Sequence, residues 1–139
     1  MGLEVLEIAA LAAQAAEEKK AKDVVILNIG GISLIADYFV IASAANKTQL
    51  MAIADNVEQV LAKQGITMLH REGHADATWI LLDYGGVVVH VMREEAREFY
   101  ALERLWGDAP VFRPETLTSD MNLSIMTNVT TANANDDGE

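Results

Sequence analysis

The spacing of apolar and polar residues along the chain predicts three helices. From Leu3 to Lys22 apolar residues recur every three or four positions, and alanine, the strongest helix former, is abundant. A second helix is expected to run to Lys63 after Asn46, a favourable N-cap residue with Gln49 at the capping-box position. A third is expected over residues 93–105, which carry charges of both signs.

Five shorter runs rich in β-branched and aromatic residues predict strands. They cover residues 24–29, 37–43, 67–71, 78–83 and 87–92. The run at 37–43 is almost continuously apolar, which is typical of a strand buried on both faces. Gly85 and Gly86 separate the last two runs and predict a tight hairpin. This order of elements predicts one α/β or α+β domain, with a mixed sheet of about five strands flanked by helices.

The composition changes at Pro110, which divides the chain into residues 1–109 and 110–139. The second part is rich in Ser, Thr, Asn and Asp, has Phe112 as its one aromatic residue, and carries a net charge of -4. We expect Pro110 to about Leu117 to pack on the domain as an extension. The remainder is expected to be a disordered acidic tail.

The chain as a whole is acidic, with a net charge of -11, and it contains no cysteine. The lack of cysteine excludes disulfides, thiolate metal sites and cysteine nucleophiles. The small number of Lys and Arg residues argues against a general nucleic-acid binder, which must neutralise phosphates. The acidic charge favours docking onto a basic partner instead.

The sequence contains no pattern typical of secretion or membrane insertion. Glutamates occupy positions 4 and 7, where a secretory signal would carry basic residues before an apolar run. The most apolar stretch, residues 24–45, is interrupted by Asp37 and by the pair Gly30 and Gly31, which a membrane span would hardly contain. The chain is therefore expected to be a cytoplasmic protein that does not contact the membrane.

Residues able to support catalysis or metal binding are present but dispersed. His70 and His74 are four positions apart, with Asp76 nearby, but Gly73 between them favours a loop in which both histidines are simply exposed. No serine lies in a nucleophile elbow, and no pair of acids has the spacing of a two-metal site. We expect no catalytic centre, no metal and no cofactor. An enzyme that uses Asp37, Asp83, His74 and His90 remains the alternative.

Two aromatic side chains in the strands suggest a binding surface or a core. Strand alternation places His90 on the face of Val88 and Met92. It is either a hydrogen-bonded structural histidine or a functional one, as part of a contact surface or as a general base. Trp79 shares one face with two later residues of its strand and is an anchor candidate if that face is open. In the third helix Phe99, Tyr100 and Trp106 lie near helical spacing, which favours core packing.

Five ordered groups of residues resemble the ribosomal silencing factor family, also called the Iojap family. The resemblance covers about residue 3 to Ala109. The matching strings are Asp37-Tyr38-Phe39-Val40-Ile41-Ala42-Ser43 with Asn46, Ala52-Ile53-Ala54-Asp55-Asn56-Val57-Glu58, Glu72-Gly73 with Trp79-Ile80-Leu81-Leu82-Asp83-Tyr84-Gly85, Val87-Val88-Val89-His90-Val91, and Glu95-Ala96-Arg97-Glu98-Phe99-Tyr100 with Leu102-Glu103-Arg104-Leu105-Trp106.

The resemblance implies a nucleotidyltransferase-like fold without catalytic acids, and a function in translation. Such a protein would bind ribosomal protein L-fourteen on the large ribosomal subunit and block joining of the small subunit under nutrient limitation. Relatives in organelles assist large-subunit assembly. The resemblance also implies a possible homodimer when the protein is free, and no direct sequence-specific contact with nucleic acid.

The residues expected to bind the partner come from the last predicted strands and the third helix. Asp37 is a weaker candidate. The main candidates are Trp79, Leu81, Asp83, His90, Met92, Arg97, Tyr100 and Arg104.

One position departs from the family pattern, which usually has Gly-Asp before the valine run. Here the pair is Gly85-Gly86. If the family acid contacts the partner, this chain should bind more weakly or through a shifted contact. If the acid only shapes the hairpin, Gly86 is tolerated because glycine accepts positive φ.

Overall fold

The computed structural model describes residues 4–31, 36–73, 78–101 and 110–112. Within them one six-stranded sheet has the order β3-β4-β5-β2-β1-β6. The elements are α1 (Val5–Glu18), β1 (Lys22–Asn28), β2 (Tyr38–Ala44), α2 (Lys47–Lys63), β3 (His70–Glu72), β4 (Trp79–Asp83), β5 (Val87–Arg93), α3 (Glu94–Tyr100) and β6 (Val111–Phe112).

The sheet is mixed, as the sequence predicts. β2 and β5 are parallel, whereas the other neighbouring strands are antiparallel. All five predicted strands are present, and β6 adds a sixth by pairing Val111 with Leu27 of β1. Residues 110–112 of the expected extension therefore belong to the sheet, and the expected acidic tail lies outside the described residues.

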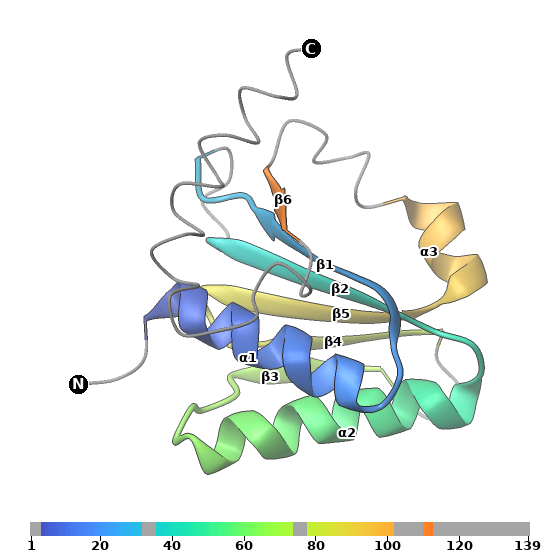
Figure 1. The fold of residues 1–139 in the computed structure, drawn as a ribbon, viewed down its shortest axis with the longest axis horizontal. Helices are drawn as coiled ribbons and strands as arrows, with labels where there is room; N and C mark the ends of the chain where they lie inside the picture. The colour runs from blue at the N-terminus through green and yellow to red at the C-terminus, as the bar shows by residue number, and fades with distance from the viewer. Residues whose placement is uncertain (1–3, 32–35, 74–77, 102–109, 113–139) are drawn as a thin grey trace.

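Helices α1 and α2 lie together on one face of the sheet (Figure 1). The side of α1 that meets the sheet is made of alanines, of which Ala9, Ala12, Ala13 and Ala16 are fully buried. Such small side chains let the helix backbone approach its neighbours closely, while larger residues of α2 and the strands fill the core. The alanine-rich helix predicted from the sequence thus packs against the core through its alanines.

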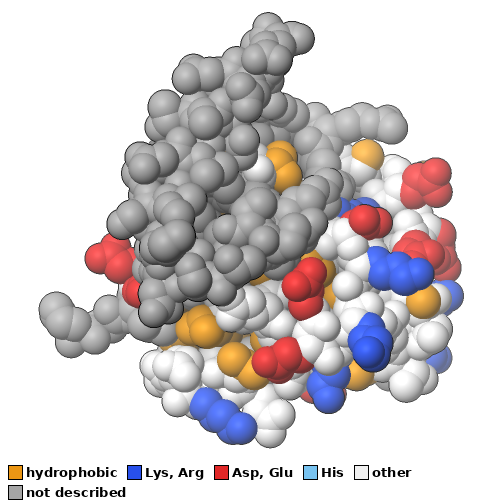
Figure 2. Space-filling view, in the orientation of Figure 1, with side chains coloured by type: hydrophobic (Ala, Val, Ile, Leu, Met, Phe, Trp, Pro, Cys, Tyr) orange, Lys and Arg blue, Asp and Glu red, His pale blue; other side chains and the backbone are white. Residues whose placement is uncertain are grey.

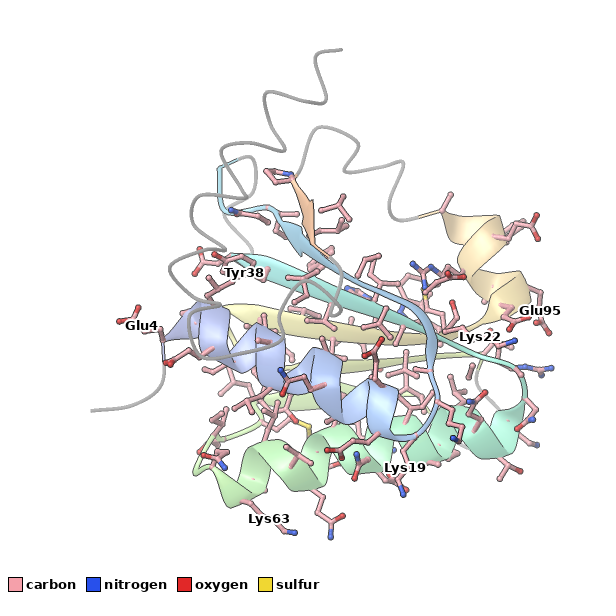
Figure 3. The ribbon with its side chains drawn as sticks, in the orientation of Figure 1. Glu4, Lys19, Lys22, Tyr38, Lys63 and Glu95 are labelled. Atoms are coloured by element: carbon pink, nitrogen blue, oxygen red, sulfur yellow. The ribbon has the colours of Figure 1, made fainter. Side chains whose placement is uncertain are left out.

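The prediction that the first helix reaches Lys22 is wrong, because α1 ends at Glu18 and Lys22 begins β1. Lys20 adopts φ +65°, which cannot continue a right-handed helix. The Gln49 side-chain amide donates to the carbonyls of Lys19 (3.1 Å) and Lys20 (3.0 Å). Figure 3 shows Lys19 at the end of α1 beside α2. A tertiary contact therefore satisfies carbonyls that the next helical turn would have used.

The start of α2 confirms Asn46 as the N-cap, because its Oδ1 accepts from the Gln49 N–H at 2.8 Å. The reciprocal half of a capping box is displaced by one residue. Gln49 Oε1 accepts from the N–H of Ala45, at 2.7 Å, rather than from that of Asn46. Gln49 therefore joins the start of α2 to the end of α1.

The predicted two-glycine hairpin joins β4 to β5. Tyr84 N–H donates to the Val87 carbonyl at 2.8 Å, leaving Gly85 and Gly86 as the two loop residues. Gly85 has φ +91°, and its N–H donates to Asp83 Oδ1 at 2.8 Å. The positive φ required by this turn belongs to Gly85, whereas Gly86 does not have one.

Gly73, directly after β3, has both a positive φ and no room for a side chain. Its φ is +111°, and a Cβ there would lie 2.9 Å from the Trp79 carbonyl oxygen. We expect Gly73→Ala to lower the free energy of unfolding by about 2–3 kcal/mol, because strain and steric overlap add. Urea unfolding followed by circular dichroism measures this.

Gly65→Ala is the matched control, because Gly65 has φ +78° but no atom lies within 4 Å of the position that a Cβ would take there. Its free energy of unfolding should fall only by the cost of the backbone conformation, about 1 kcal/mol. Equal losses in the two variants would show that the contact with the Trp79 backbone contributes nothing.

Candidate functional site

The two faces of the sheet differ in how helices cover them. Around α1 and α2, acidic and basic side chains are interspersed in Figure 2, which is typical of an ordinary solvated surface. The opposite face has a separate apolar cluster, packed against Ala96 of α3. The members of that cluster on the strands include Val25, Leu27, Phe39, Ile41, Val88 and Met92. The predicted partner-binding residues of β4 and β5 lie on this second face.

Alternation along β4 is as the sequence predicts. Ile80 and Leu82 are fully buried on the helix side, whereas Trp79, Leu81 and Asp83 point the other way and are half-buried. The antiparallel register of β4 and β5 sets these three residues opposite Met92, His90 and Val88, respectively. We call Trp79, Leu81 and Asp83 the β4 face.

The residues of β5 expected to share this surface lie beneath it. Met92 has no exposed area and His90 is 4% exposed. They support the β4 face from the adjacent strand instead of presenting their own side chains to solvent. Their direct contact with a partner stays a prediction, and burial assigns them a supporting position in this structure.

Three rings form a diagonal row across β2, β5 and β4, which we call the aromatic row. The Phe39 and His90 ring centroids are 4.5 Å apart in an edge-on arrangement with an interplanar angle of 66°. The His90 and Trp79 centroids are 5.6 Å apart. The row runs from buried Phe39 through His90 to half-buried Trp79, so the outer ring rests on a rigid interior.

His90 is held by a hydrogen bond as well as by packing. Its Nδ1 accepts from Trp79 Nε1–H at 3.0 Å. An imidazole that accepts at Nδ1 while neutral carries its proton on Nε2. Nε2 is buried and has no hydrogen-bond partner among the described residues. Burial lowers the His90 pKa to about 4, so the ring is neutral at physiological pH.

Arg97 of α3 is an internal anchor and is 9% exposed. Its guanidinium donates to the Asp23 carbonyl at 2.6 Å and to Ser43 Oγ at 2.8 Å. Asp23 lies in the irregular part of β1, with φ +51°. Arg97 thereby ties α3 to β1 and β2. Its role as a direct partner contact stays a prediction.

The third helix is shorter than predicted and exposes an aromatic residue. α3 ends at Tyr100 because Ala101 adopts a left-handed conformation with φ +49°. Phe99 is 80% exposed, so the expectation that it packs in the core is wrong. Among the described side chains of α3, the buried ones are those of Ala96 and Arg97, so the inward side of the helix does not include Phe99. The sequence does not reveal where the helix ends. Arg104 and Trp106 lie outside the described residues.

The metal hypothesis cannot be completed from the described part of the chain. His70 pairs with Glu72 on the exposed edge strand β3, while His74 and Asp76 lie outside the described residues. No group of three His, Asp or Glu residues among those described could hold a metal ion.

No helix in the described part of the chain is long and apolar enough to span a membrane.

The position that departs from the family pattern is crowded. A Cβ on Gly86 would lie 2.9 Å from Val5 Cγ1 and 3.4 Å from Asp37 Oδ2. We expect Gly86→Asp to lower the free energy of unfolding by about 1–2 kcal/mol, through overpacking against Val5 and repulsion by Asp37. Chemical denaturation measures the loss.

Gly86→Ala separates the steric part from the electrostatic part of that loss. It should lose less stability than Gly86→Asp, and adding Asp37→Asn should recover part of the difference. If Gly86→Asp is as stable as the parent chain, the start of α1 yields without cost and glycine is not required at this position.

The fold and the β4 face define a small mixed-sheet domain, with α1 and α2 on one face of the sheet and a partly exposed tryptophan on the other. Comparison with known proteins gives the family. The family model described as "Ribosomal silencing factor during starvation" matches residues 3–138. The chain belongs to the ribosomal silencing factor family. The match extends past Ala109, where the resemblance seen in the sequence ended.

Individual relatives agree over most of the domain. The ribosomal silencing factor of Halalkalibacterium halodurans is 46% identical over 113 residues, covering 81% of this chain and 97% of that protein. That of Bacillus subtilis is 44% identical, covering 73% and 86%. A crystal structure of a Chromobacterium violaceum protein superposes with a TM-score of 0.74 at 35% identity, covering 76% of this chain and 88% of that one.

More distant relatives come from organelles. Protein Iojap of Zea mays chloroplasts is 33% identical over 106 residues, covering 76% of this chain and 46% of that protein. The mouse protein named mitochondrial assembly of ribosomal large subunit protein 1 is 29% identical over 92 residues, covering 64% and 40%.

Proposed function

We propose that this protein represses translation by binding ribosomal protein L-fourteen on the large ribosomal subunit and thereby blocking association with the small subunit. Membership of the ribosomal silencing factor family is the observation that carries the proposal. The repression is expected under nutrient limitation and in the cytoplasm.

The proposed mechanism is steric exclusion. The β4 face supplies the contact, with Trp79 as its anchor because a half-buried tryptophan offers a large apolar area together with an indole donor. The net charge of -11 favours encounter with a basic ribosomal protein. Bound at the surface where the subunits meet, the domain would occupy space that the small subunit needs, and no chemical step is involved.

The test is sedimentation of the purified protein with separated ribosomal subunits. We expect it to migrate with the large subunit only, and to lower the fraction of joined ribosomes when the small subunit is added. Cross-linking should place L-fourteen next to the bound protein. Failure to migrate with the large subunit at low salt would refute the proposal.

A second candidate is assistance of large-subunit assembly, which the name of the mouse relative favours. The two roles share a partner but differ in timing. Depletion of an assembly factor would accumulate incomplete large subunits during growth, whereas depletion of a silencing factor would leave them complete and raise translation in starved cells.

The enzyme alternative is tested by calorimetry with nucleotides and divalent ions. Saturable binding would support a nucleotidyltransferase-like activity using Asp37, Asp83, His74 and His90.

The homodimer proposed for the free protein is tested separately by light scattering with and without large subunits.

A further inference from the structure

We infer that His90 is a positioning residue: its imidazole holds the indole of Trp79 in one orientation on the β4 face. The inference rests on the proposed function, since it concerns the anchor of that contact. Trp79 and His90 lie on adjacent antiparallel strands, diagonal to one another on one face of the sheet. This arrangement brings Nε1 of the indole within 3.0 Å of Nδ1 of the imidazole.

The orientation of the imidazole is itself fixed from below. The register sets His90 opposite Ile41 in β2, and Phe39 contacts the ring edge-on with centroids 4.5 Å apart. Both side chains are buried. Nδ1 therefore presents its lone pair to β4 from a rigid site, and the indole bound to it is confined as well.

The buried histidine also carries a cost that an apolar ring would avoid. With Nδ1 accepting from Trp79, the proton is on Nε2, which has no acceptor among the described residues. A phenylalanine could fill a similar volume without burying an unsatisfied N–H. What the histidine provides, and phenylalanine does not, is the acceptor at Nδ1.

Holding the indole matters for binding because an anchor already in its bound orientation loses less side-chain entropy on association. Trp79 lies at the partly exposed end of the aromatic row, where a free indole could occupy several rotamers. A hydrogen bond to the buried ring selects one. His90 thereby contributes to affinity without touching the partner.

Two substitutions separate the acceptor from the ring. His90→Phe keeps a ring and removes the acceptor. His90→Asn removes the ring but places Oδ1 near the position of Nδ1, so it can still accept from the indole. We measure hydrogen exchange at the indole N–H of Trp79 by nuclear magnetic resonance, in a Trp106→Phe background that leaves a single tryptophan. Affinity for purified large subunits is measured in parallel.

We expect His90→Phe to lose indole protection and to bind large subunits about 10-fold more weakly, while it stays folded. His90→Asn should keep protection and stay within about 3-fold of the parent affinity, a change too small to reflect loss of the ordered anchor. Parent-like protection and affinity in His90→Phe would overturn the inference. The inference would also be overturned if His90→Phe and His90→Asn lost the same affinity while the indole stayed protected, because packing of the imidazole ring, and not its acceptor, would then determine the affinity.

The two measurements, indole hydrogen exchange and affinity for large subunits, keep this inference distinct from the proposed function. If the parent protein does not bind large subunits, the proposed function fails, and indole exchange alone decides whether His90 holds Trp79. If His90→Phe does not fold, Trp79→Phe removes the donor from the other side of the same bond. It should show the same loss of affinity, and unchanged affinity would overturn the inference.

Discussion

Replacing Trp79 by alanine is expected to weaken binding to the large ribosomal subunit by about 30-fold or more. That is roughly 2 kcal/mol, the range for a tryptophan at the centre of a protein interface. The substitution deletes the largest side chain of the β4 face and leaves the buried His90 without its hydrogen-bond donor. Sedimentation or fluorescence titration with purified large subunits gives the ratio of dissociation constants.

The control is an apolar truncation at an exposed residue outside the aromatic row. Leu69 precedes β3 and is 67% exposed, so Leu69→Ala removes apolar area without touching the aromatic row. It should bind like the parent protein. Circular dichroism and thermal unfolding show whether Trp79→Ala keeps its fold. A folded Trp79→Ala with unchanged affinity would remove Trp79 from the interface, and a collapsed one would assign it to the core.

Should the alanine variant unfold, Trp79→Leu retains much of the apolar volume while removing the indole. A folded leucine variant is still expected to bind at least several-fold more weakly, since it lacks the flat ring and its donor. The binding prediction can therefore be tested even if one of the two variants does not fold.

The positions of the strands could be predicted from the sequence because their signals are local. The continuous apolar run of β2 predicts a central strand, and β2 lies between β5 and β1. Alternation in β4 predicts which residues share the face of Trp79, and the register confirms it. Period and run length are properties of neighbouring residues, so a single sequence contains them.

The features that were missed depend on residues far apart in the chain. α1 ends just before Lys19 and Lys20, whose carbonyls accept hydrogen bonds from Gln49, about thirty residues later. Arg97 is turned inward by atoms 74 and 54 residues away, on Asp23 and Ser43. Alternation assigned His90 to the correct face, but it could not say what covers that face. The sequence pattern predicts on which face of a strand a side chain lies, but the packing of the folded domain determines whether that side chain is exposed.

Acidification is expected to destabilise this protein through His90, with a total effect of about 3 kcal/mol. Burial lowers the His90 pKa from 6.5 to about 4 in the folded state, while the unfolded chain keeps the ordinary value. Between these values the unfolded chain binds a proton that the folded chain does not. The stability contributed by the neutral ring is therefore nearly complete above about pH 6.5, is lost as the pH falls, and is fully lost only below about pH 4.

The group responsible is isolated by comparing pH profiles of unfolding. At pH 5 the parent should have lost about 2 kcal/mol from this source relative to pH 7.5, whereas His90→Phe should not show that component. Leu69→Ala is the control, since it truncates an exposed side chain without changing any titratable group, and its profile should run parallel to that of the parent. Parallel profiles for the parent and His90→Phe would mean that His90 takes up its proton equally easily in the folded and unfolded chains. The neutral imidazole that accepts from Trp79 would then not persist below pH 6.5, so the low-pH experiment also tests the bond that orients the proposed anchor.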